Sequence, residues 1–104
     1  MRSVITARHT DLSPRLRQRA ERLLPRIAKH ARRPRSAEII FDADHGQKVV
    51  EMLVSLPRGI TAVARAEAPT FPSALTRAAA KLKHQLDGRA GKRLAKRRRA
   101  GPRA

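Results

Sequence analysis

The middle of the chain alternates between apolar and polar positions and predicts three short strands. Apolar side chains recur at every second position in residues 37–41, 49–56 and 60–68. A period of two is typical of a strand that buries one face. Turn-forming residues at 42–47 and 57–59 separate the three runs. The pattern therefore predicts an antiparallel meander.

The N-terminal third predicts one more strand and a helix. Residues 3–9 alternate as a strand does, and Ser13-Pro14 is a typical helix start, because Ser13 can cap the free N–H groups and proline suits the first helical position. Pro25 removes one helix hydrogen bond, so we expect a kink or an early helix end nearby. The apolar positions recur every three or four residues, as on the buried face of a helix. They are Leu16, Ala20, Leu23 and Ile27.

A second helix is predicted after Pro69, with Thr70 as its cap and Pro72 tolerated in its first turn. Gly88 and Gly91 predict that this helix frays or stops near them. We therefore divide the chain into a folded domain, residues 1–88, and a basic, flexible C-terminal tail, residues 89–104. The apolar stripe of the helix is Leu75, Ala79, Leu82 and Leu86.

The predicted order is β-α-β-β-β-α. A sheet with one apolar face buries that face under helices. We therefore expect an α+β, two-layer sandwich in which two helices pack side by side on one face of a four-stranded sheet.

The charge is concentrated at the two ends of the sequence. The 104 residues carry 25 Lys and Arg against 8 Asp and Glu, a formal net charge of +17. Residues 1–35 and 77–104 hold eleven cationic residues each, whereas residues 36–76 hold three cationic residues and five acids. A surface that only provides solubility would not separate charge in this way. The distribution indicates a polyanionic partner, nucleic acid or an anionic membrane.

Cationic side chains also follow the helical period. An ordinary solvated face is the simplest alternative, but such a face mixes both signs, and in the first helix only Glu21 offers the opposite sign. Because like charges at these spacings repel each other, a polyanionic partner explains the stripes better. The stripe of the first helix is Arg15, Arg19, Arg22, Arg26, Lys29 and Arg33; that of the second is Arg77, Lys81 and His84.

The remaining chemistry favours phosphate contact over catalysis or base reading. Only Phe41 and Phe71 are aromatic, and core or cap contacts explain both, so no aromatic platform is expected for unstacked bases. The four histidines lack metal-ligand spacing, and the sequence has no cysteine. Asp42, Asp44 and His45 fit a hairpin turn better than a hydrolytic site. We therefore expect no enzyme activity, cofactor, metal or small-molecule substrate.

Three motifs resemble the ribosome hibernation-promoting factors, also called ribosome-associated translation inhibitors. Residues 5–13, ITARHTDLS, are similar to the opening of that family, and residues 65–68, RAEA, resemble the strand before its last helix. Ala74-Leu75, followed by Lys81-Leu82 and Gln85-Leu86, is similar to the signature of that helix. The resemblance covers about residues 1–87 and corresponds to the short form, without the dimerisation domain of the long form.

The resemblance implies a cytoplasmic bacterial stress and stationary-phase factor that binds the small ribosomal subunit. It would occupy the decoding region through ribosomal RNA phosphates, occlude messenger and transfer RNA, and inhibit translation. In some bacteria the short form needs a separate ribosome-dimerising factor to pair ribosomes. No membrane partner is expected. By position in the family, the RNA contacts are Arg8, Lys81 and His84. Charge alone adds Arg15, Arg19, Arg22, Arg26, Lys29, Arg77, Lys83, Arg89 and Lys92.

Two other functions remain open. A general double-stranded RNA or DNA architectural protein would share the α-β-β-β-α order, although it leaves the strand at residues 3–9 without a role. A ribosome-rescue hydrolase would also use a basic tail. His45-Gly46-Gln47 lacks the first glycine of the Gly-Gly-Gln motif of those enzymes, which counts against this function.

Overall fold

The computed structural model describes residues 1–98, with side chains as far as Gly88. The observed order confirms the predicted β-α-β-β-β-α arrangement. The elements are β1 (Arg2–Arg8), α1 (Pro14–Ala28), β2 (Ser36–Asp44), β3 (Gln47–Ser55), a short 3-10 turn (Pro57–Gly59), β4 (Thr61–Ala68) and α2 (Phe71–Arg98).

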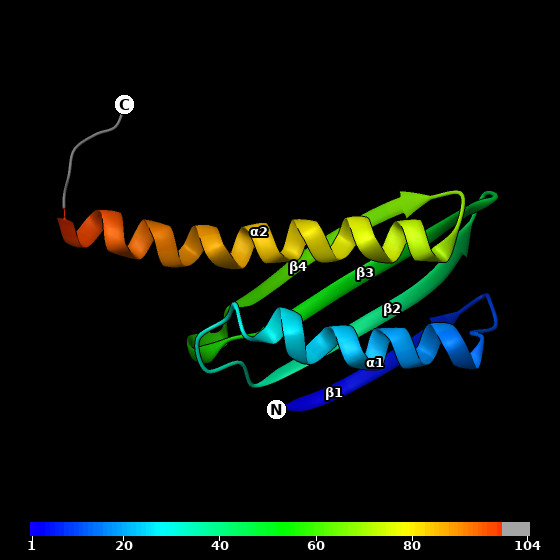
Figure 1. Ribbon diagram of the computed structural model, residues 1–104, viewed down its shortest axis with the longest axis horizontal. Helices are drawn as coiled ribbons and strands as arrows, with labels where there is room; N and C mark the ends of the chain where they lie inside the picture. Colours follow the sequence, from blue (N-terminus) through cyan, green and yellow to red (C-terminus); the bar gives the residue numbers. More distant parts are fainter. Residues whose placement is uncertain (99–104) are drawn as a thin grey trace.

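The strands form one sheet in the order β1-β2-β3-β4. β1 pairs with β2 in parallel, and β2, β3 and β4 form the predicted antiparallel meander. Both helices lie side by side on the same face of this sheet (Figure 1). The two-layer α+β fold is therefore confirmed.

The two helices run parallel to each other, and their N-termini meet at one end of the sheet (Figure 1). This direction follows from the topology, because β1 and β4 point the same way and each is followed by a helix that returns over the sheet. A helix N-terminus carries partial positive charge. Two helix termini with partial positive charge therefore lie at the same end of the molecule.

Both predicted helix caps are present. The Oγ of Ser13 accepts a hydrogen bond from the backbone N–H of Leu16 at 3.2 Å, and Pro14 occupies the first turn of α1. The Oγ1 of Thr70 accepts a hydrogen bond from the N–H of Ser73 at 3.3 Å. Each cap satisfies one of the N–H groups that a helix start leaves without an internal partner.

β2 extends three residues beyond its predicted end because the hairpin turn is shorter than the turn-forming residues suggest. Only His45 and Gly46 lie between β2 and β3, with φ angles of 50° and 79°. Two consecutive positive φ angles are typical of the tightest hairpin turns. Asp42 therefore belongs to a strand, and its side chain leaves the sheet on one face.

Pro25 lies inside α1, which continues for less than one turn and ends at Ala28. The helix thus ends close to the proline, as expected. The predicted core face needs one correction: Leu24 is 1% exposed, whereas Leu23 is only partly buried. Leu16, Ala20 and Leu24 follow one another at four-residue steps, and this row faces the sheet.

The predicted end of α2 near Gly88 and Gly91 is wrong, because the helix continues to Arg98. Glycine costs a helix interior about 1 kcal/mol relative to alanine, which strong helix formers around it can offset. The C-terminal turns of α2 extend past the end of the sheet (Figure 1). A flexible tail from residue 89 stays a prediction, and residues 99–104 lie outside the described part of the chain.

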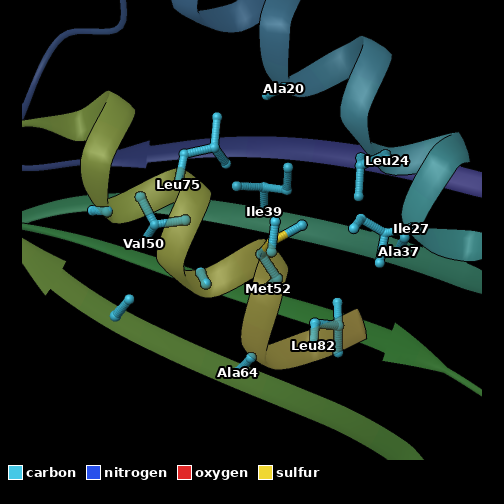
Figure 2. Packing of buried hydrophobic residues seen from close by; sticks show 14 of the residues in the cluster. Ala20, Leu24, Ile27, Ala37, Ile39, Val50, Met52, Ala64, Leu75 and Leu82 are labelled. Carbon is cyan, nitrogen blue, oxygen red and sulfur yellow. The ribbon is translucent and has the colours of Figure 1, made fainter. Parts of the chain in front are cut away.

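The core lies between the sheet and the helices. Figure 2 shows Leu24 and Ile27 of α1 and Leu75 and Leu82 of α2 pointing toward the sheet. β4 contributes only small side chains, which allow α2 to pack close to the strand. These buried residues of β4 are Ala62, Ala64, Ala66 and Ala68.

Adjacent leucines on α1 provide a test of the core. We predict that Leu24→Ala lowers the free energy of unfolding by about 3 kcal/mol, because it leaves a cavity against the sheet. Leu23→Ala, the matched control, should cost about 1 kcal/mol or less because Leu23 is partly exposed. Urea unfolding measures both variants. Equal losses would contradict the observed orientation of α1.

Candidate nucleic-acid interface

The predicted stripe of α1 is present and solvent-exposed. It comprises Arg15, Arg19, Arg22, Arg26 and Lys29, the last of which caps the C-terminus of the helix. Arg33, which the sequence pattern assigned to the same face, lies in the connector beyond the helix with a φ of 53°. The prediction for Arg33 is therefore wrong, because the helical period ends at Ala28.

The predicted stripe of α2 is divided between two directions. The exposed side chains of Arg77 and Lys81 turn toward β4: Nη1 of Arg77 donates to the carbonyl of Glu67 at 3.1 Å, and Nζ of Lys81 donates to the carbonyl of Arg65 at 2.9 Å. Gln85 continues the series, its Nε2 donating to the carbonyl of Val63 at 2.7 Å. We call Arg77, Lys81 and Gln85 the edge ladder.

The edge ladder follows from two backbone repeats. Four helical residues advance about 6 Å and two strand residues about 6.6 Å, so side chains four apart on α2 meet carbonyls two apart on β4. β4 is an edge strand, whose outer carbonyls have no partner strand. Sequence periodicity alone assigned Arg77 and Lys81 to an outward stripe, because it carries no information about the neighbouring strand.

Two contacts join the helices. Nη2 of Arg19 donates to Oγ1 of Thr76 at 3.1 Å, and Nδ1 of His30 lies 2.8 Å from Oδ1 of Asp87. Thr76 and Asp87 therefore mark the flank of α2 that faces α1. Lys83 lies seven residues from Thr76 and four from Asp87, so helical geometry places it on that same flank.

Lys and Arg residues and His84 on the outside of the helix layer form one surface, which we call the helical cationic surface. All of its members are exposed. Of the remaining predicted contacts, Arg89 and Lys92 lie in the part of α2 whose side chains are outside the described residues. The members are Arg15, Arg19, Arg22, Arg26, Lys29, Lys83 and His84.

The face of the sheet that the helices leave uncovered has a different character. We call it the open sheet face. Four acids that each follow or precede a buried strand residue lie on it, together with Arg65, whose Nη1 lies 2.7 Å from Oε2 of Glu67. Arg8 lies on this face beside Asp42, its register partner on β2, and not with the helical cationic surface. The four acids are Glu38, Asp42, Glu51 and Glu67.

His9 and Asp42 form a polar contact at the end of β1. Nδ1 of His9 lies 3.0 Å from Oδ1 of Asp42, and this hydrogen bond is the main reason that the pKa of Asp42 is lowered. The backbone N–H of Ala43, which donates to the same oxygen at 2.8 Å, lowers the pKa further. The contact therefore fixes a carboxylate on the open sheet face.

The geometry gives no support to the hydrolytic alternative at the hairpin. Asp44 and His45 contact each other at 2.6 Å and both are exposed, whereas Asp42 contacts His9. Within residues 1–98, no group of three or more His, Cys, Asp or Glu residues is placed to hold a metal ion. These side chains do what turn and strand-end residues commonly do, forming local hydrogen bonds.

Sequence reasoning missed one feature near the helix N-termini. Phe41 is fully buried as expected, but Phe71 is only partly buried and lines a cavity of about 410 Å³. The two rings meet edge to face at 5.5 Å between centroids, and Nζ of Lys48 lies 5.4 Å from the centroid of Phe71. No local pattern in the sequence indicates this cavity, because its walls come from three separate segments.

Comparison with known proteins identifies the family. Residues 3–94 match the profile of the family described as sigma 54 modulation protein / S30EA ribosomal protein. The chain belongs to this family. The hibernation-factor resemblance is confirmed by this match. A search among curated proteins finds no match.

Two solved structures share the family fold. A ribosomal subunit interface protein from Coxiella burnetii is 28% identical, with a TM-score of 0.76, over 88% of this chain and 99% of that chain. The N-terminal domain of Protein Y from Thermus thermophilus is 20% identical, with a TM-score of 0.70, over 84% of this chain and 97% of that chain. Of the helices within residues 1–98, none has the length and apolar character needed to cross a membrane.

The edge ladder gives a stability prediction for two neighbouring lysines. Lys81→Met should lower the free energy of unfolding by about 0.5–1 kcal/mol, because the carbonyl of Arg65 loses a donor. Lys83→Met removes the same charge from the flank facing α1 and should leave stability nearly unchanged. Urea unfolding of both variants is the measurement. An equal loss in both would show that charge, and not the ladder contact, determines the effect.

The contact between His9 and Asp42 gives a pH prediction. Because the folded state lowers the pKa of Asp42, its contribution to stability is present above the unfolded pKa and is lost as the pH falls through the folded pKa. His9→Ala should raise the pKa of Asp42 toward its ordinary value, as measured by carboxyl-carbon NMR titration. His45→Ala, which removes a neighbour of Asp44, should leave Asp42 unchanged; a raised pKa in that variant instead would contradict the assignment.

Proposed function

We propose that this protein binds the decoding region of the small ribosomal subunit, occludes messenger and transfer RNA there, and silences idle ribosomes under stress. Membership of the family indicates a ribosome-associated modulation protein. Binding proceeds through ribosomal RNA phosphates, needs no catalytic group or cofactor, and takes place in the cytoplasm of a bacterium.

The observation that carries the proposal is the helical cationic surface. Six exposed Lys and Arg residues and His84 lie on the outside of the helix layer, while the acids of the strands lie on the open sheet face. Arginine and lysine contact phosphates by charge and position a protein without reading sequence. The helix layer is therefore the face that we assign to ribosomal RNA.

The edge ladder does not remove Arg77 and Lys81 from the proposed interface. Arginine has five N–H donors and the lysine ammonium three, and each uses one in the recorded contact with β4. Both side chains remain exposed. They border the helical cationic surface on the β4 side, and we retain them as proposed RNA contacts with a second, structural role.

The name of the Coxiella burnetii relative, a ribosomal subunit interface protein, supports a ribosomal partner. We extend that partner to the small subunit and its RNA. For the pairing of ribosomes, the further partner that we propose is a separate ribosome-dimerising factor.

The alternative function, a general double-stranded RNA or DNA architectural protein, would use the same cationic residues. An architectural protein of this kind should bind any duplex with comparable affinity. Measuring the affinity for vacant small subunits and for a naked RNA duplex of similar charge therefore distinguishes the two functions. Preference for the subunits supports the proposal, and equal binding supports the alternative.

Two arginines of α1 form a matched pair for a binding test. Arg22→Gln removes a charge from the helical cationic surface and should weaken binding to vacant small subunits. If one phosphate contact is lost, the slope of log affinity against log salt should fall in magnitude by roughly 0.7–0.9. The measurement is co-sedimentation on sucrose gradients at several salt concentrations, together with inhibition of translation in vitro.

Arg17→Gln is the control, because it removes an equal charge from the opposite flank of the same helix. Arg17 precedes Arg19 by two residues, and Arg19 faces α2. Side chains two residues apart on a helix point about 200° away from each other around the helix axis. Arg17→Gln should have a smaller effect on affinity and on the salt slope. Equal effects of the two variants would mean that net charge governs binding, and the assigned face would be wrong.

A further inference from the structure

The cavity beside Phe71 lies where α1 and α2 begin. Its volume of about 410 Å³ falls in the range of about 300–1,000 Å³ that is typical of small-molecule sites. Its exposed lining surface is mainly apolar, and the apolar residues of the lining are Leu16, Pro69, Phe71 and Pro72. A cavity of this composition suits a flat, largely apolar group more than a free ion.

Charged groups also line this cavity, and Nζ of Lys48 lies over the ring of Phe71. Lys48 and Arg15 provide donors, and the carboxylate of Asp11 provides an acceptor. Donors and an acceptor around an apolar cavity match the edge of a nucleobase, which presents both kinds of group. A simple anion site would not include Asp11, because the carboxylate would repel the anion.

A second hollow adjoins the cavity across Arg19 and Pro72, which line both. It has a volume of about 300 Å³, and its other walls are Ser73, Thr76 and Arg77. Two guanidinium groups and two hydroxyl groups around one open hollow are the donors that bind phosphate. The apolar cavity and the cationic hollow therefore stand side by side, as do the base and the phosphate of a nucleotide.

We propose that these neighbouring hollows bind one nucleotide of ribosomal RNA, with an unstacked base in the cavity beside Phe71 and its phosphate in the hollow between Arg19 and Arg77. This inference rests on the proposed function and deepens it. The helical cationic surface gives affinity without reading sequence, and the cavity adds a position at which an unpaired nucleotide is required. Duplex RNA, whose bases are stacked, cannot fill the cavity.

The first test uses adenosine 5′-monophosphate as the probe on the full chain. In a ¹H–¹⁵N NMR titration, we expect it to shift the amide signals of Leu16, Phe71 and Ser73. Ribose 5-phosphate, which lacks the base, should bind about tenfold more weakly, because the apolar cavity stays empty. The absence of shifts, or equal binding of the two probes, would overturn the base site.

The second test uses Ser73→Asp, which places a carboxylate in the phosphate hollow. An acidic residue in the first turn of α2 is compatible with the helix, so the variant should fold. We expect about fivefold to tenfold weaker binding both of adenosine 5′-monophosphate and of vacant small subunits. Thr61→Glu makes the same charge change on the open sheet face and should alter neither by more than about twofold.

The outcomes separate this inference from the function on which it rests. If Ser73→Asp weakens binding of adenosine 5′-monophosphate but not of small subunits, the site serves a free nucleotide and the assignment to ribosomal RNA is wrong. If the unaltered protein binds small subunits but not adenosine 5′-monophosphate, the nucleotide site is wrong and the proposed function stands. If the unaltered protein fails to bind small subunits at all, the proposed function fails first.

Discussion

The fold depends on the burial of one face of a four-stranded sheet under two parallel helices. Alternation along β2, β3 and β4 gives that face its apolar side chains, and the alanines of β4 allow α2 to lie close to it. Because the facing surfaces of the sheet and the helices are buried against each other, charged side chains can lie only on the outer surfaces. The cations of the two helices lie on the outside of the helix layer, and the acids of the strands lie on the open sheet face. The proposed RNA-binding face is thus a consequence of where the core lies.

The packing of α2 on β4 also gives a structural role to residues that, from their charge alone, would be assigned only to RNA binding. Edge strands expose backbone carbonyls that invite pairing with other chains, and proteins often protect such edges with charged side chains. Arg77 and Lys81 protect the edge here, and neutral Gln85 continues the same spacing. The presence of a glutamine shows that the series is defined by donor position and not by charge. Two basic residues of this helix therefore have a structural role in addition to the binding role that we propose for them.

Local sequence patterns predicted the helices and strands. The features that the sequence did not predict depend on contacts between helices and strands that are distant in the chain. The alternation of β2–β4 and the caps Ser13 and Thr70 are local, and each was predicted correctly. Leu23 and Leu24 both fit a helical apolar face, and only the angle of α1 on the sheet selects Leu24. Gly88 was predicted to end α2, and this was wrong because the free-energy cost of a glycine in a helix is small compared with the helix propensity of its neighbours. The cavity beside Phe71 needs three segments in their folded positions, so no single segment predicts it.

The separation of charge between the two layers has a consequence for how the protein meets its target. A molecule whose cationic residues are concentrated on one face is turned by the field of a polyanion before contact, which favours productive encounters. The two helix N-termini add positive partial charge at one end of the cationic face, so the field also distinguishes the two ends of the helix layer. The hollows proposed for a nucleotide lie at that same end. Orientation is therefore set by the arrangement of layers and helix directions, and single side chains adjust the affinity within it.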